Sequence, residues 1–489
     1  MSQNNEDILQ SKEIIKLADR PKKLFPLWEV VLGMFIALVF SLFFYYGFFN
    51  TIENQSIDFR FKQRGELQSS RDIVLVSITD DCVEKLGSWP WPRETHAKLL
   101  KILKSAGAKL AAFDIMFTEE SLMGEADDAE FARAIANFGN VVLPQVISKK
   151  VVLDPETFEP REVVEPDRPC AALLKAQPFE GFIDLEYKQL NPDGVMRKLM
   201  LTKPYDGSTS YIFGLVAAAA YLGVEPEEVS NGMRMGTERR LPYYRCYEPA
   251  AEKVMSSYLI NYAGGNAHFD EITYSDVIEG RFPQNFFSNR LVLIGTRAKG
   301  LSEDVKFCPY GALSGVEIHA NLLHNILNRR FLHRSSVTNT ILLIFVFAIG
   351  MGYYLWKNRT FSGDFICFVL AVGWAALSVI LFRIDVILEI TPIIILIPIE
   401  WALIRLIQQF ESLSEKNFEL AKKVLDTLET KESNFTPLYD LNLPNKEKIN
   451  AIAASTLHSE SFFTFSFPFV FSFIVIFQSQ LFLFHKPHL

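Results

Sequence analysis

The sequence predicts an α/β domain with a mixed, partly parallel sheet, joined to four transmembrane helices and a short coiled coil. Two observations lead to this fold class. One apolar segment near the N-terminus and three more after residue 334 are each long enough to cross a bilayer. Between them, apolar runs of strand length alternate with amphipathic runs of helical length, which is typical of a partly parallel sheet.

The composition excludes several classes of protein. Of the 489 residues, 49% are hydrophobic and 42 are Phe, which is incompatible with a disordered chain. The net charge of −8 argues against a nucleic acid as partner. Five cysteines are too few for a disulfide-dense secreted scaffold. A membrane protein with a water-exposed domain fits these values.

The first transmembrane helix is predicted at residues 30–52, after an N-terminal segment (1–29) that is expected on the cytoplasmic side. The run is uncharged and rich in Phe. A signal peptide is the alternative, because several Lys and Arg residues precede the run. The run is too long for a signal peptide, and no small-residue cleavage site follows it. These features favour an uncleaved anchor in the lipid bilayer.

Hydrophobicity returns at residues 335–356, 365–382 and 386–406, which are the predicted second, third and fourth transmembrane helices. The connections, KNRTFSGD and RID, suit only tight turns between antiparallel helices. Glu389 and Glu400 interrupt the last helix near its ends. They are interpreted as interfacial side chains or, alternatively, as functional carboxylates within the membrane.

The four helices place residues 53–334 on one side of the membrane and both flanks on the other. Basic residues are almost equally frequent near the helix ends of the two sides, because Arg60, Arg64, Arg330 and Arg334 of the middle segment balance those of the flanks. The charge distribution alone therefore leaves the orientation open.

The middle segment, 53–334, carries the α/β pattern. Its expected elements are, in order, a strand at 72–79, a helix at 95–107, a strand at 109–117, a helix at 127–139, a strand at 140–147, a strand at 290–296 and a helix at 315–328. Strands joined through helices predict right-handed crossovers and a parallel core sheet. The turn PDGVMRK at 192–198 predicts an added antiparallel part.

Several stretches of this segment together resemble a known family. The run IVLVSITDDCVEKLGSWPWPRETHAKLLKILKSAGAKLAAFDIMF is similar to the start of the CHASE domain of the second type, an extracytoplasmic sensor of bacterial signalling proteins. Further matches follow in the expected order: GNVVLP, NPDGVMRK, LINYAGG, YSDVIEGRFP, LVLIGT and GVEIHANLLHNILNRRFL. The resemblance implies a sensor domain over 53–334 outside the inner membrane, with an unknown ligand. It also implies a cytoplasmic output such as a class III nucleotide cyclase or a histidine or serine/threonine kinase.

Three carboxylates are candidate ligand contacts. Asp80, Asp81 and Asp114 follow or end predicted strands, and parallel sheets collect ligand contacts at the carboxyl ends of their strands. The alternative is that they cap helices or tie loops, as Asp does at strand-to-helix turns.

A stiff aromatic loop supplies the second group of candidates. Trp89, Trp91 and Arg93 lie in the sequence WPWPR directly before a predicted helix. Trp and Arg are enriched at binding surfaces. The loop could equally cover the sheet edge, with Pro92 starting the helix.

No metal or cofactor is predicted. His319 and His324 are five residues apart on one predicted helix, which is wrong for a shared metal-binding face, and the glycine-rich phosphate motifs are missing from the sequence. Four of the five cysteines fall in the middle segment, outside the reducing cytoplasm. The irregular spacing gives no disulfide framework and favours free buried thiols, and the alternative is a disulfide between Cys82 and Cys308, which both follow predicted strands.

Residues 407–433 predict a short cytoplasmic coiled coil and hence a homodimer. Apolar residues and one Asn recur with heptad spacing: Leu406, Phe410, Leu413, Asn417, Leu420 and Val424. A solvated amphipathic helix is the alternative. In a membrane receptor, such a segment would pass a signal to an output domain.

The tail, 434–489, contains no recognisable element of a nucleotide cyclase or a kinase. Residues 461–484 are uncharged and Phe-rich, which suggests either a fifth transmembrane segment or a shifted reading frame replacing an ancestral output domain. The sequence thus predicts a non-enzymatic sensor whose output comes from a separate cytoplasmic protein. The alternative is a truncated class III cyclase or sensor kinase.

Overall fold

The computed structural model describes residues 28–153, 160–185, 190–205, 208–229, 232–248, 253–298, 305–359 and 361–432. The described residues fall into two compact units. One contains the described residues up to Ala37, together with Phe345–Cys367 and those from Leu396 onward; the other contains Leu38–Ile344 and Phe368–Ile395. The predictions for the N-terminal segment before Trp28 and for the Phe-rich tail 434–489 lie outside the described residues.

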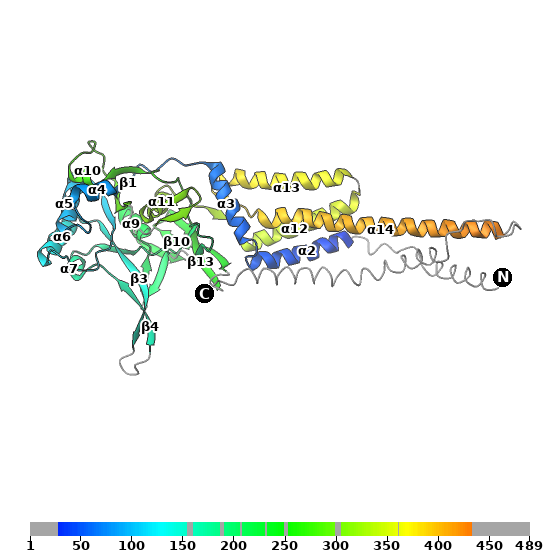
Figure 1. The fold of residues 1–489 in the computed structure, drawn as a ribbon, viewed down its shortest axis with the longest axis horizontal. Coiled ribbons are helices and arrows are strands. Elements are labelled where there is room, and N and C mark those ends of the chain that lie inside the picture. Colours follow the sequence, from blue (N-terminus) through cyan, green and yellow to red (C-terminus); the bar gives the residue numbers. More distant parts are fainter. Residues whose placement is uncertain are drawn as a thin grey trace. The chain divides into compact units, whose positions relative to one another are not determined.

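The chain alternates helices and strands (Figure 1). The helices are α2 (Trp28–Tyr45), α3 (Asn50–Arg64), α4 (Asp80–Leu86), α5 (Arg93–Ser105), α6 (Glu125–Phe138), α7 (Ala171–Leu174), α9 (Phe213–Leu222), α10 (Tyr274–Ile278), α11 (Gly315–Leu327), α12 (Val337–Lys357), α13 (Phe361–Phe382) and α14 (Thr391–Glu432). The main-sheet strands are β1 (Ile73–Ile78), β2 (Leu110–Asp114), β3 (Val141–Leu153), β4 (Pro160–Asp167), β5 (Phe179–Phe182), β14 (Asp270–Thr273) and β15 (Leu291–Thr296).

The sheet of the second unit is mixed, as predicted. Strands β14, β1, β15, β2 and β3 are hydrogen-bonded in that order and are parallel, and β5 is also parallel to β3. Strand β4 is antiparallel to β3, and the two form an arm that extends from the rest of the domain (Figure 1). Strand β15 lies between β1 and β2, although it comes some 180 residues after the latter in the chain.

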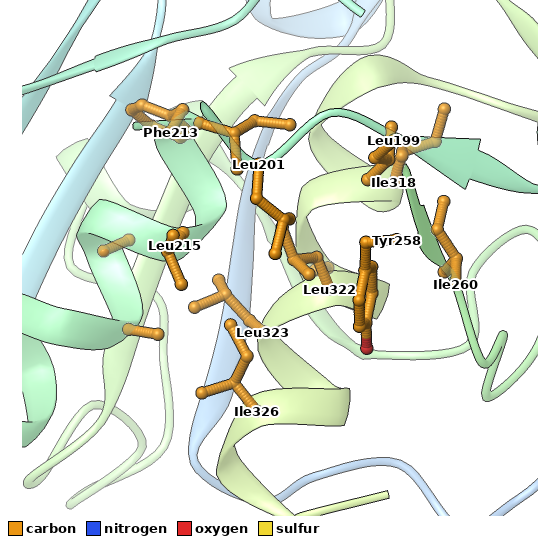
Figure 2. Packing of buried hydrophobic residues seen from close by; sticks show 14 of the residues in the cluster. Leu199, Leu201, Phe213, Leu215, Tyr258, Ile260, Ile318, Leu322, Leu323 and Ile326 are labelled. Carbon is orange, nitrogen blue, oxygen red and sulfur yellow. The ribbon is translucent and has the colours of Figure 1, made fainter. Parts of the chain in front are cut away.

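Both faces of the sheet are covered, because alternate residues of each strand point to opposite sides. In β1, Val74 and Val76 pack with α4, α5, α6, α7 and α10, whereas Ile73 and Leu75 pack with α3, α9 and α11. Figure 2 shows part of the core between the sheet and helices α3, α9 and α11. There, Phe213 and Leu215 of α9 lie with Leu322 and other apolar residues of α11. Each such side chain, once fully buried, contributes about 1.5–3 kcal/mol.

Small antiparallel pieces complete the domain. Their strands are β6 (Lys198–Leu199), β7 (Thr202–Tyr205), β8 (Ser208–Tyr211), β9 (Pro226–Val229), β10 (Gly232–Met235), β11 (Arg239–Pro242), β12 (Tyr244–Glu248), β13 (Lys253–Leu259), β16 (Lys306–Cys308) and β17 (Gly311–Leu313). The exception is a parallel pair, β18 (His333–Arg334) with β19 (Val386–Ile387). Cys82 and Cys308, the plausible pair, are both buried free thiols.

Four described helices are long and apolar enough to cross a membrane, by length and composition: Trp28–Tyr45, Val337–Lys357, Asp364–Phe382 and Thr391–Leu420. The first is shorter than the predicted 30–52, because the chain turns after Tyr45 through Gly47, which has φ +73°, and starts a separate helix, α3. The last begins at Thr391, since residues 386–387 form β19. Helix α14 continues to Glu432, so the predicted coiled-coil segment is helical.

Candidate functional site

The predicted ligand carboxylates lie at the carboxyl ends of neighbouring parallel strands but are not brought together. Asp80 and Asp81 form the exposed first turn of α4, directly after β1. Asp114 ends β2, pairs in register with Gly295 and faces the start of α11, since a Cβ on Gly315 would lie 3.6 Å from its Oδ2. Strand β15 lies between β1 and β2. Asp114 of β2 is therefore about 10 Å, twice the spacing of neighbouring strands, from β1, the strand that precedes Asp80.

The aromatic loop contributes mainly to packing. Trp91 is 3% exposed, and its ring nitrogen donates to the Gly87 carbonyl at 2.8 Å. Trp89 is half-buried, and its ring lies edge-on to that of Trp91 at 5.1 Å between centroids. The pair covers one end of the helix-covered core, with Trp89 retaining the accessible surface that a ligand contact requires.

Arg93 joins α5 to α6. Its guanidinium lies over the Phe117 ring, 4.7 Å from the centroid, and its Nε donates to the Asp128 carboxylate at 3.3 Å. Its backbone N–H donates to Asp127 at 2.7 Å. Asp127 and Asp128 both lie in the first turn of α6, where carboxylates offset the helix dipole. The ligand role of these six sequence candidates stays a prediction.

A buried histidine in the same core was missed by sequence reasoning. His96 of α5 is 1% exposed, lies among the rings of Trp91, Phe117 and Phe131, and shares a 2.9 Å hydrogen bond through Nδ1 with the Tyr274 hydroxyl. Burial lowers the pKa of His96 to about 3, and burial also raises the pKa of Tyr274. The imidazole is therefore neutral at physiological pH. In the sequence, His96 has no feature that distinguishes it from the other polar residues of the predicted helix.

The start of α11 gathers further polar groups at the same edge of the sheet. Glu317 is 2% exposed and accepts hydrogen bonds from the Ser314 N–H (2.9 Å), the Ser314 hydroxyl (2.8 Å) and the Ala267 N–H (3.1 Å). Arg297, which follows β15, pairs with Glu271 and lies 3.9 Å from Glu317. Over the described ranges, no three His, Cys, Asp or Glu side chains gather in a way that could hold a metal ion.

A second polar site lies where the domain meets the helices, and we call it the junction: helix α3, residues 330–336 and residues 382–391. At its centre is the buried ion pair of Glu53 and Arg60, each 1% exposed. Arg60 also donates to the Ser378 hydroxyl (2.9 Å) and the Leu388 carbonyl (3.0 Å). Arg60 thereby ties α3 to α13 and to the connection between α13 and α14.

The other carboxylate oxygen of Glu53 binds the start of α14. It accepts from the backbone N–H of Ile390 (3.1 Å) and Thr391 (3.0 Å) and from the Thr391 hydroxyl (2.8 Å). These N–H groups lie at the helix N-terminus, where a carboxylate is stabilised by the helix dipole.

Asp385 is the second anchor of the junction. Arg330 donates two hydrogen bonds to the Asp385 carboxylate, at 2.8 and 2.9 Å. The Arg64 guanidinium lies 3.6 Å from the same carboxylate, and the Asn261 side-chain amide donates to it at 2.9 Å. The buried Phe382 ring lies beneath the guanidinium groups of Arg60 and Arg64, with centroid distances of 5.7 and 5.3 Å. Such desolvated cation–π contacts each contribute about 2 kcal/mol.

The backbone closes the junction. Strands β18 and β19 pair in parallel, with bonds from the His333 N–H to the Asp385 carbonyl (2.7 Å) and from the Ser335 N–H to the Ile387 carbonyl (3.1 Å). Arg334 forms an ion pair with Glu389, which is 3% exposed. Arg60, Arg64, Arg330 and Arg334, the arginines that balanced the charge count, thus lie beside the carboxylates of Glu53, Asp385 and Glu389. Apart from Glu53 and Arg60, the members of these ion pairs are 55 to more than 300 residues apart in the sequence. No short sequence motif could therefore predict them.

The comparisons with known proteins agree with this architecture. The family model described as the CHASE2 domain matches residues 34–353, most of the chain and nearly all of the α/β domain. No solved structure gives a significant match. The chain belongs to the CHASE2 family, whose domains are extracytoplasmic sensors.

Proposed function

We propose that this chain is a multi-pass receptor of the bacterial inner membrane that senses a stimulus outside the membrane and transmits it through the junction to its transmembrane helices. The observation that carries this proposal is the buried polar network of the junction. Buried ion pairs are weak contributors to net stability but impose a defined geometry, because breaking one leaves an uncompensated charge. A network of this kind suits an element that must hold one of two discrete arrangements.

A continuous chain of contacts supports transmission. Helix α11 starts beside Asp114 at the sheet edge where the ligand candidates lie, and it ends near the junction. Near that end, the Asn325 side chain accepts from the Asn261 N–H (2.9 Å) and donates to the Asn261 carbonyl (2.7 Å), and the Asn261 side chain in turn binds Asp385. A shift of α11 on ligand binding would therefore reach Asp385 through Asn261. These contacts suggest a route for the signal from the sheet edge to the junction, which measurements of the coupling energy between residues along it would establish.

The expected orientation places the sensor domain in the periplasm or outside the cell. Fusions of alkaline phosphatase, which is active only outside the cytoplasm, test this placement. A fusion after residue 200 is expected to be active and one after residue 420 inactive. The reverse pattern would invert the topology and remove the proposed direction of signalling.

A second copy of the chain is the proposed partner of α14. Four apolar residues of this helix are each about half exposed: Leu406, Phe410, Leu413 and Leu420. They follow the heptad spacing, so one stripe of the helix offers an apolar surface to a parallel partner. A dimer would bring two copies of the helix end to a separate cytoplasmic output protein, and the chain itself would act without catalysis.

Disulfide crosslinking of the full chain in membranes tests dimerisation and transmission together. Leu413→Cys is expected to crosslink two copies, and Arg60→Gln in the same background is expected to change the crosslinking rate. Arg234→Gln is the matched control, because Arg234 forms an exposed pair with Glu227 away from the junction. Absence of any crosslink would refute the dimer. Equal rates in the Arg60→Gln and Arg234→Gln backgrounds would refute transmission through the junction.

A further inference from the structure

One carboxylate within the membrane-crossing helices stands apart from the others. Glu400 of α14 is 0% exposed, and neither of its carboxylate oxygens has a hydrogen-bond partner among the described residues. The other acids near it are paired: Asp364 of α13 accepts from Arg405 and Trp401, both at 2.7 Å, and Glu29 of α2 lies 3.5 Å from Arg359. Helix α14 also contains Pro398, which removes one backbone hydrogen bond of the helix close to Glu400.

Glycine makes room for the Glu400 side chain. A Cβ on Gly33 of α2 would lie 2.6 Å from Glu400 Oε1 and 2.8 Å from the Ala348 carbonyl oxygen of α12. A Cβ on Gly352, one turn after Ala348, would lie 2.7 Å from the Glu29 carbonyl oxygen. Helices α2 and α12 therefore approach through small residues, as membrane helices do where backbones touch, and the carboxyl group is enclosed at that contact.

Among the described residues, no Lys or Arg side chain forms an ion pair or a hydrogen bond with Glu400. Besides Glu400, the described ionisable side chains on α2, α12, α13 and the part of α14 up to Arg405 are those of Glu29, Tyr45, Tyr353, Tyr354, Lys357, Asp364, Cys367 and Arg405. None of them bonds to Glu400 in the described part of the chain, and Arg405 is already engaged by Asp364 and by Gln408 at 2.7 Å. Glu400 lies five residues before Arg405, so the two positions are about 7.5 Å apart along the helix axis. Ionising a carboxyl group in such surroundings costs several kcal/mol, whereas the neutral acid needs no partner charge.

We propose that Glu400 is a proton-binding site inside the transmembrane bundle and that the packing of α2 against α12 and α14 requires the bound proton. The ligand is the proton itself, taken up by the carboxylate to give a neutral carboxylic acid. Its release would place a negative charge against the Gly33 backbone and the Ala348 carbonyl, and the three helices could accept that charge only by separating to admit water. The site is independent of the proposed receptor function and of the external ligand.

Infrared spectroscopy of the full chain in phosphatidylcholine vesicles at neutral pH tests the proposal. A protonated carboxyl and a carboxylate absorb in separate regions, so the difference spectrum between wild type and a variant reports the state of the acid that was removed. Wild type minus Glu400→Gln is expected to contain a carboxylic-acid band. Wild type minus Asp364→Asn, the matched control for a paired acid, is expected to contain only carboxylate bands. Carboxylate bands in the Glu400→Gln difference spectrum would overturn the proposal.

A second variant covers the case in which Glu400→Gln fails to fold. Glu400→Asp keeps the acid but shortens its reach toward Gly33, so the carboxylic-acid band is expected to persist with a changed frequency. A band that stays at the wild-type frequency would originate from another residue and would equally overturn the assignment.

Discussion

The Glu53–Arg60 pair allows a quantitative test of the junction. Arg60→Met removes the guanidinium and leaves Glu53 buried, with the Ile390 and Thr391 donors as its remaining partners. Removing one member of a buried pair typically costs about 3–5 kcal/mol. Because those donors still solvate the carboxylate, the loss is expected near the lower end, about 3 kcal/mol. At about 2–4 °C per kcal/mol for a domain of this size, the unfolding temperature should fall by about 6–12 °C.

Thermal unfolding of the detergent-solubilised full chain, followed by circular dichroism, measures this change. Arg234→Met is the control, since its exposed pair with Glu227 contributes about 0–1 kcal/mol. The double variant Arg60→Met/Glu53→Gln is expected to be more stable than Arg60→Met alone, because the buried charge is gone while the Gln oxygen still accepts from the α14 backbone. A fall for Arg60→Met no larger than for the control would refute the reasoning, as would a double variant no better than the single one.

Three further outcomes are expected. The pKa of His96 is about 3 in the folded protein and about 6.5 in the unfolded chain, so between these pH values the unfolded chain binds the extra proton. The free energy of unfolding should therefore fall by about 1.4 kcal/mol for each pH unit below about 6.5. His96→Phe should reduce this dependence of the unfolding free energy on pH, and an equal dependence in wild type and variant would contradict the assignment. Gly295→Ala should lose about 1–3 kcal/mol in chemical denaturation, because its Cβ would lie 2.8 Å from the Val316 Cβ and 3.0 and 3.1 Å from the two Val316 Cγ atoms. Val316→Ala in the same chain removes the two Cγ contacts and should restore part of the loss. Asp80→Asn/Asp81→Asn should leave the unfolding temperature nearly unchanged, within about 0.5 kcal/mol, yet abolish the thermal shift caused by a ligand found by screening, and an undiminished shift would remove these two carboxylates from the site.

The local elements of the fold were predictable from the sequence, whereas their order in the sheet was not. The runs around Val74 and Val292 read as buried strands because they are continuous, apolar and of strand length. That β15 enters between β1 and β2 follows from packing of residues some 180 positions apart, which periodicity does not encode. Helix α3 was not predicted: its first residues fell in the predicted first span and the rest in a stretch without an assigned element. The sequence NTIENQSIDFRFKQR is polar overall, and its buried face is recognisable only once Glu53 and Arg60 are seen to pair.

The candidate site was only partly accessible for the same reason. Sequence reasoning selected residues at strand ends, and the structure places Asp80, Asp81 and Asp114 there. It valued Trp91 and Arg93 for their residue type, but the contacts of both side chains run mainly to the domain's own core and helices. The junction was missed because an arginine that lies near a membrane segment normally indicates topology, whereas Arg330 here has its partner, Asp385, in another connection.

The β18–β19 pairing restricts how the helices that follow these strands can move. Because the bonds from His333 and Ser335 are made by the backbone, no side-chain substitution removes them. The segments that lead into α12 and α14 are consequently joined by backbone hydrogen bonds, so neither helix start can slide along its axis past the other without breaking the β18–β19 bonds. A displacement originating in the domain must carry both helix starts together, as a tilt or a rotation of a single rigid block. Inserting one residue between Ser335 and Val337 would leave the β18–β19 bonds in place but rotate α12 by about 100° about its axis, a change that no single side-chain substitution reproduces.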